Sequence, residues 1–146
     1  MSAEQNKALT SRFVEEFLNQ GHFDRADVFL STNYVEHVPA PPGFPTGVAG
    51  LIQYFTLLRQ AFPDLNYRVE DTVAEGDKVV ARLTGRGTMK GDFLGIPATG
   101  KQATWTEMHI ARVGPDGKFV EHWAVVDQLG MLQQLGLVPT PGQPPQ

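Results

Sequence analysis

The chain has 146 residues, of which 41% are hydrophobic and 19% are charged, a balance typical of one globular domain. The formal net charge of −4 gives no basic field for nucleic acid or an anionic membrane surface. The chain has no cysteine, which excludes disulfides and cysteine-based nucleophiles or metal sites and fits a reducing compartment. We therefore expect a cytoplasmic protein, since no secretory signal is evident and no apolar run approaches the roughly 18 residues of a spanning helix.

The first part of the chain has the apolar periodicity of helices. Leu9, Phe13 and Phe17 repeat at a spacing of four residues, which places them on one face of a helix. The segment 39–47 holds four prolines and cannot form regular structure. Pro63 ends the last helix of this part, because a residue before proline avoids the helical region. We predict helices over residues 4–20, 22–30 and about 48–62, with a short extended segment at 33–38 between the last two.

The second part of the chain changes to the period of strands. Two turn sequences, EGDK at 75–78 and GPDGK at 114–118, are typical of hairpins. The glycine-rich segment 90–101 predicts a long loop, and residues 128–136 a last short helix. The predicted strands lie within residues 66–75, 77–89, 102–113 and 118–127.

Helices followed by a run of long antiparallel strands indicate the α+β class. We predict a cone-shaped, curved antiparallel sheet, an α+β barrel, whose concave face is covered by the N-terminal helices and encloses a pocket. Residues 1–138 should form a single domain. Residues 139–146 should be a mobile proline-rich tail, because they offer no hydrophobic face.

Ionisable residues gather in the last hairpin, where strands normally carry apolar side chains. Alternation places Glu107 and His109 on one face of their strand, about 7 Å apart. The hairpin can bring His122 of the next strand beside His109, although the register is open at this point. A single glutamate or histidine in a strand is more often solvated than catalytic. The grouping is what indicates acid/base chemistry, because a carboxylate beside an imidazole holds its tautomer and tunes its proton affinity.

Other kinds of site have little support. Histidines and glutamates are present, but none has a spacing diagnostic of zinc, so we expect no metal. The loop 90–101 lacks the Gly-Lys-Ser/Thr signature of a phosphate loop, and no Gly-x-Ser-x-Gly elbow of a serine hydrolase occurs.

The motifs FVEEFLNQG, YVEHVPAPPG, AFPDL, FLGIPATGK and GKFVEHWAVVDQLGMLQQLG run in order through nearly the whole chain. With them the chain resembles the SnoaL-like polyketide cyclases, or ester cyclases, of the nuclear transport factor 2-like superfamily. The resemblance implies the cone-shaped fold, a deep and mostly apolar pocket, a homodimer packed through the outer sheet face, and no cofactor. It also implies ring closure by intramolecular aldol condensation.

The resemblance assigns catalytic positions to His109, Glu107, His122 and Glu36. The family's essential acid/base is an aspartate two residues after the last histidine, and Ala124 stands at that position here. Glu107, Glu36 or Asp127 would have to supply the missing carboxylate. We assign substrate binding to Tyr34, His37, Tyr54, Trp105, Ala124 and Asp127.

Two functions follow from this pattern. The favoured one is a cofactor-independent acid/base enzyme acting on a small apolar carbonyl compound, as a cyclase or else as an isomerase, dehydratase or hydrolase. The alternative is a ligand-binding or dimerisation module without turnover, which Ala124 favours. A homodimer is also expected because Trp123 and Val125 fall on the outer face of the last strand.

Overall fold

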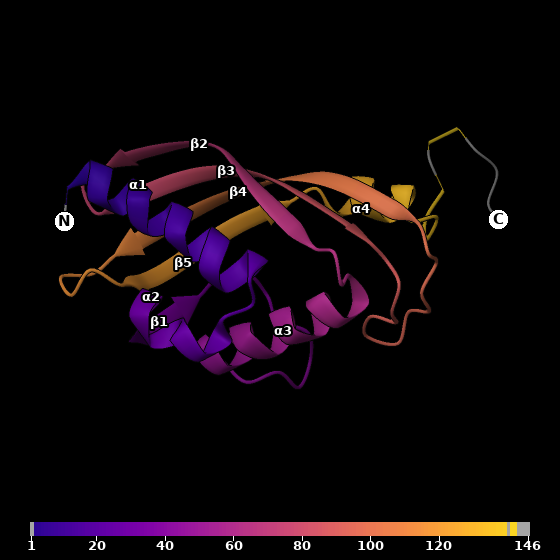
Figure 1. Cartoon of the computed structure of the whole chain (residues 1–146), viewed down its shortest axis with the longest axis horizontal. Coiled ribbons are helices and arrows are strands. Elements are labelled where there is room, and N and C mark those ends of the chain that lie inside the picture. Colours follow the sequence, from indigo (N-terminus) through magenta and orange to yellow (C-terminus); the bar gives the residue numbers. More distant parts are fainter. Residues whose placement is uncertain (1, 140, 143–146) are drawn as a thin grey trace.

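The protein is described by a computed structural model that covers residues 2–139 and 141–142. Across these residues the strands form one five-stranded sheet with the order β1-β5-β4-β3-β2. Figure 1 shows this sheet with α1, α2 and α3 along one side and the loop after β3 extending past the end of α3. The strands are β1 (Leu30–Glu36), β2 (Asn66–Glu75), β3 (Lys78–Thr88), β4 (Gln102–Val113) and β5 (Phe119–Val126).

The first helical run is wound in two ways. An α-helix ends at Arg12 and continues without a break as a π-helix that ends at Asn19, so the predicted helix over 4–20 is one rod with a wider second half. π-helical turns are rare and occur mainly at functional sites. The helices are α1 (Ala3–Arg12), the π-helix η1 (Phe13–Asn19), the 3-10 helix η2 (Phe23–Arg25), α2 (Ala26–Phe29), α3 (Gly47–Ala61) and α4 (Gln128–Gln134).

The α+β prediction is confirmed, with a refinement in the sheet. Four strands form an antiparallel meander as expected, but β1 pairs with β5 in parallel, so the sheet is mixed. It is also open, because β1 and β2 are the two ends of the strand order. The parallel register places Glu36 directly beside His122, across 86 residues of sequence.

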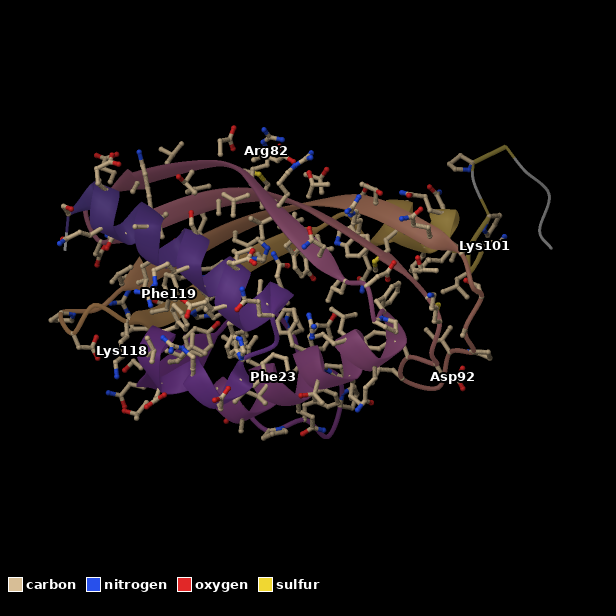
Figure 2. All side chains as sticks on the ribbon, viewed as in Figure 1. Phe23, Arg82, Asp92, Lys101, Lys118 and Phe119 are labelled. Carbon is tan, nitrogen blue, oxygen red and sulfur yellow. The ribbon has the colours of Figure 1, made fainter. Side chains whose placement is uncertain are left out.

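The core lies between the concave face of the sheet and the helices. Phe17, Phe29 and Phe62 are fully buried there. Figure 2 shows Arg82 projecting from the opposite, outer face, whereas Phe119 points between the sheet and the helices. The predicted tail, residues 139–146, falls mostly outside the described residues.

The side chain of Asn19 closes part of the free edge of the sheet. Its Nδ2 donates to the carbonyl oxygen of Tyr67 at 2.8 Å, and its Oδ1 accepts from the Tyr67 amide at 2.7 Å. Asn19 therefore imitates a neighbouring strand at one residue of β2. The Arg59 guanidinium holds this end of η1 by donating to the carbonyls of Leu18 and Asn19.

We predict that Asn19→Ala lowers the free energy of unfolding by about 2 kcal/mol, because two partly buried hydrogen bonds are lost at about 1 kcal/mol each. Urea denaturation followed by circular dichroism measures this loss. Asn33→Ala is the control, since Asn33 is exposed and its side chain makes no hydrogen bond among the described residues. Equal stability of the two variants would contradict the role given to Asn19.

Candidate active site

Two strands place their ionisable side chains on the concave face. His109 of β4 pairs with Ala124 of β5, and His122 pairs with Ala111. The two histidines are therefore diagonal neighbours, and each faces an alanine across the ladder. Because alanine leaves space opposite each ring, the rings lean toward one another and stack with centroids 5.1 Å apart.

The polar groups on this face form one continuous chain of hydrogen bonds. Glu107 Oε1 lies 2.7 Å from His109 Nε2, and His109 Nδ1 lies 2.8 Å from His122 Nε2. His122 Nδ1 lies 2.6 Å from Glu36 Oε2, and the Tyr34 hydroxyl donates to Glu36 Oε1 at 2.9 Å. The chain thus joins β1, β5 and β4, with a carboxylate outside each histidine.

Glu36 is held in its ionised form. Burial by itself would raise the pKa of this carboxyl, but its hydrogen-bond partners together outweigh burial, and His122 contributes most through its hydrogen bond and charge. The Tyr34 hydroxyl and the Val38 amide act in the same direction, so the pKa of Glu36 lies below its usual range. Burial and the nearby Glu36 carboxylate in turn raise the pKa of Tyr34, which keeps its hydroxyl a hydrogen-bond donor.

Glu107 is buried behind His109, with only 6% of the residue exposed, and does not line the cavity described below. Its Oε2 accepts from the Trp105 indole N–H at 2.6 Å. The indole lies against Gly85 of β3, where a Cβ atom would come within 2.6 Å of the ring. Burial, followed by the Glu107 charge, raises the pKa of both Tyr67 and Tyr54. Glu107 therefore fixes the orientation of His109.

A mostly apolar cavity of about 70 Å³ meets this chain of hydrogen bonds. It is about half the roughly 150 Å³ that accommodates benzene in an engineered protein cavity, so a larger ligand requires side chains to move apart. Its polar wall consists of His109, His122, Glu36 and Tyr34, with Thr10 from α1. The apolar wall is Phe13, Val14, Leu18, Leu30, Leu51, Phe55, Val79, Ala81, Leu83, Ala111 and Phe119.

Two residues assigned to substrate binding lie elsewhere. His37 is on the outer face, where it hydrogen-bonds to Glu121 at 2.7 Å and stacks on Trp123, because it follows the inward-facing Glu36 and alternate residues of an extended segment face opposite sides. Asp127 follows the end of β5, is exposed, and caps α4 by accepting from the Gly130 amide. Neither residue lines the cavity, and the Asp127 carboxylate is therefore not placed to serve there.

The remaining assignments are closer to the site. Tyr34 lines the cavity, whereas Trp105 and Tyr54 lie behind it, near Glu107. Ala124 sits opposite His109 on the concave face. Helical side chains such as Phe13 and Phe55 also line the cavity. Their apolar periodicity marked a buried helical face but carried no sign of which members border a cavity. Within residues 2–139 and 141–142, no group of three potential ligands is arranged to hold a metal ion.

Comparison with known proteins assigns the family. The model of the SnoaL-like polyketide cyclases matches residues 8–135, which is most of the chain. The chain belongs to the SnoaL-like polyketide cyclase family. It is 34% identical over 134 residues to the aklanonic acid methyl ester cyclase DnrD of Streptomyces peucetius, covering 88% of each chain. The cyclase DauD of Streptomyces sp. strain C5 is equally similar, and 80% of its length is covered.

A solved structure supports the same conclusion for the fold. TsrD from Streptomyces laurentii superposes with a TM-score of 0.83 at 30% identity, covering 94% of this chain and 99% of TsrD. The expected cone of the nuclear transport factor 2-like superfamily is therefore confirmed. Because both curated relatives are named as cyclases, the comparisons support an enzymatic function.

We predict that the Glu36 carboxylate stabilises the fold in a pH-dependent way. Its pKa is lower in the folded state, so the stabilisation is fully present above the ordinary value of 4.5 and is lost as the pH falls through the folded value. Glu36→Gln should therefore lower the free energy of unfolding by about 2 kcal/mol at neutral pH and by less at an acidic pH below 4.5.

Urea denaturation at the two pH values measures this difference. Glu75→Gln is the control, since Glu75 lies at the exposed end of β2. A Glu36→Gln effect of the same size at both pH values would contradict the prediction.

Proposed function

We propose that this protein closes a ring in an apolar, ester-containing polyketide by intramolecular aldol condensation. A base removes the acidic proton next to an ester carbonyl, the enolate attacks a second carbonyl carbon, and an acid protonates the resulting alkoxide. The observation that carries the proposal is the hydrogen-bonded chain of two histidines and two carboxylates on one wall of an otherwise apolar cavity. The reaction forms a carbon–carbon bond and moves protons without net oxidation or reduction, so it needs no redox cofactor.

The side chains divide into two roles. His109 and His122 border the cavity and are the groups that exchange protons with the substrate. Glu107 and Glu36 each accept a hydrogen bond from one histidine and fix its orientation, which makes them positioning residues. The apolar wall from η1, α3 and β3 holds the carbon skeleton of the substrate and keeps water away from the enolate.

The carboxylate of Glu36 replaces the carboxylate that is missing because residue 124 is an alanine. An aspartate there would face His109 directly across the ladder. In this chain a carboxylate instead approaches from β1 and reaches His109 through the ring of His122. The names of the two relatives suggest aklanonic acid methyl ester as the first substrate to test.

A binding module without turnover is the second candidate, and Ala124 is the observation that favours it. A melting-temperature increase with aklanonic acid methyl ester, without product detectable by mass spectrometry, would support this candidate over the cyclase. Product formation would support the cyclase.

We also propose that the protein is a homodimer in the cytoplasm. Apolar side chains cross the outer face of the sheet, and Val73 and Val125 are 66% and 76% exposed. Met108 and Ile110 of β4 are exposed between them, and Met108 pairs with Val125. An apolar surface shared by neighbouring strands is typical of an interface between copies of a chain. The compartment rests on the sequence expectations alone. No helix among the described residues is long and apolar enough to cross a membrane.

We predict that His109→Ala lowers kcat/KM for cyclisation by a factor on the order of a hundred or more, because a general acid/base is removed. Initial rates by chromatography measure the loss, and circular dichroism checks the fold. His22→Ala is the matched control, since His22 is exposed and lies away from the cavity. Unchanged turnover in His109→Ala would rule out the proposed role.

We predict that Val125→Lys converts a two-chain particle into a single chain at micromolar concentration, because a buried cation at the interface costs more than the contact provides. Light scattering coupled to gel filtration measures the mass. Val28→Lys on α2 is the control, since Val28 is also exposed but lies outside the sheet. A single-chain mass for the unaltered protein would contradict the proposed dimer.

A further inference from the structure

The number of protons in the hydrogen-bonded chain of the site can be counted. Three contacts follow one another: Glu107 to His109, His109 to His122, and His122 to Glu36. Each contact needs one proton between its two atoms. Two neutral imidazoles bring one proton each, and two ionised carboxylates bring none. The three contacts therefore hold one proton more than two neutral histidines supply.

The two ends of the chain indicate where this extra proton resides. Glu36 accepts from the Tyr34 hydroxyl and the Val38 amide as well as facing His122, a donor set that suits a carboxylate. Glu107 likewise accepts from the Trp105 indole N–H at 2.6 Å, which also suits a carboxylate. With both ends ionised, His109 donates through Nε2 and His122 through Nδ1, so the extra proton lies in the 2.8 Å contact between the rings.

We propose that His109 and His122 share a single proton and act as one proton carrier in the reaction. This rests on the cyclase function proposed above, and it names two histidines, rather than one histidine with an aspartate, as the acid/base unit of this chain. The groups facing the pair are Glu36 and Tyr34 from β1 and Glu107 from β4, with Tyr67 and Tyr54 behind Glu107. The lining from η1 adds no charge, since it consists of Phe13, Val14 and Leu18.

The histidine pair acts as a base when it lacks the extra proton and as an acid when it holds it. The resting pair first gives its extra proton to water as the substrate enters, and it recovers one from water when the product leaves. Without the extra proton, the nitrogen lone pairs of the two rings face one another, so one ring turns and presents its nitrogen to the cavity as the base. It takes the proton of the C–H bond next to the ester, and that bond's electron pair forms the enolate. The enolate carbon bonds to the second carbonyl carbon, whose oxygen becomes an alkoxide. The pair then returns its proton to this oxygen, so no proton or electron is gained or lost overall.

Nuclear magnetic resonance of the 15N-labelled protein without substrate tests the shared proton. Ring-nitrogen chemical shifts report how many protons each imidazole holds, and at neutral pH the four ring nitrogens of His109 and His122 should together hold three. A proton signal far downfield of the amide region should accompany them. A total of two would mean that the extra proton is absent or sits on a carboxyl group, and a total of four would mean two separate cations. Either result overturns the proposal.

Variants make the assignment specific. His122→Gln should remove the downfield signal and leave His109 to titrate alone, whereas His37→Gln, on the outer face, should leave the signal unchanged. Persistence of the signal in His122→Gln would overturn the proposal. The proton count is measured without substrate, so it tests only the shared proton and not the cyclase function. Turnover of the substrate tests the cyclase function separately.

Discussion

The parallel pairing of β1 with β5 is the contact on which the site depends. It brings Glu36 beside His122 and directs Tyr34 to the same face of the sheet. Without it, His109 and His122 would form a hairpin pair with a carboxylate at one end only, that of Glu107. With it, each histidine has an acceptor on its far side, so both rings are fixed and their remaining nitrogens meet.

Local alternation made part of this arrangement predictable. The hairpin between β4 and β5 is short, so the concave positions of Glu107 and His109 follow from the period of two residues. The outward positions of Trp123 and Val125 follow in the same way, as does the α+β class from the change of period along the chain. These features depend on neighbours in the sequence.

Features that depend on contacts between distant segments could not be predicted from the sequence. Nothing local shows that β1 runs parallel to β5. The outward position of His37, by contrast, follows from alternation once Glu36 is placed on the concave face. The sequence around Asp127 does not show whether this residue caps a helix or lines a pocket. The structure decides it, because α4 begins directly after Asp127. The proton chain is likewise a property of the tertiary structure, because its four acid/base groups come from three strands.

The double hydrogen bond of Asn19 has a consequence for how a ligand enters. η1 lines the cavity with Phe13 and Leu18, and the same helix ends at the residue that closes the edge of β2. A ligand that widened the cavity by displacing η1 would leave backbone groups of β2 open to pairing with another chain, the usual starting point of edge-to-edge aggregation. The fold therefore links the width of its cavity to the protection of its sheet edge against aggregation.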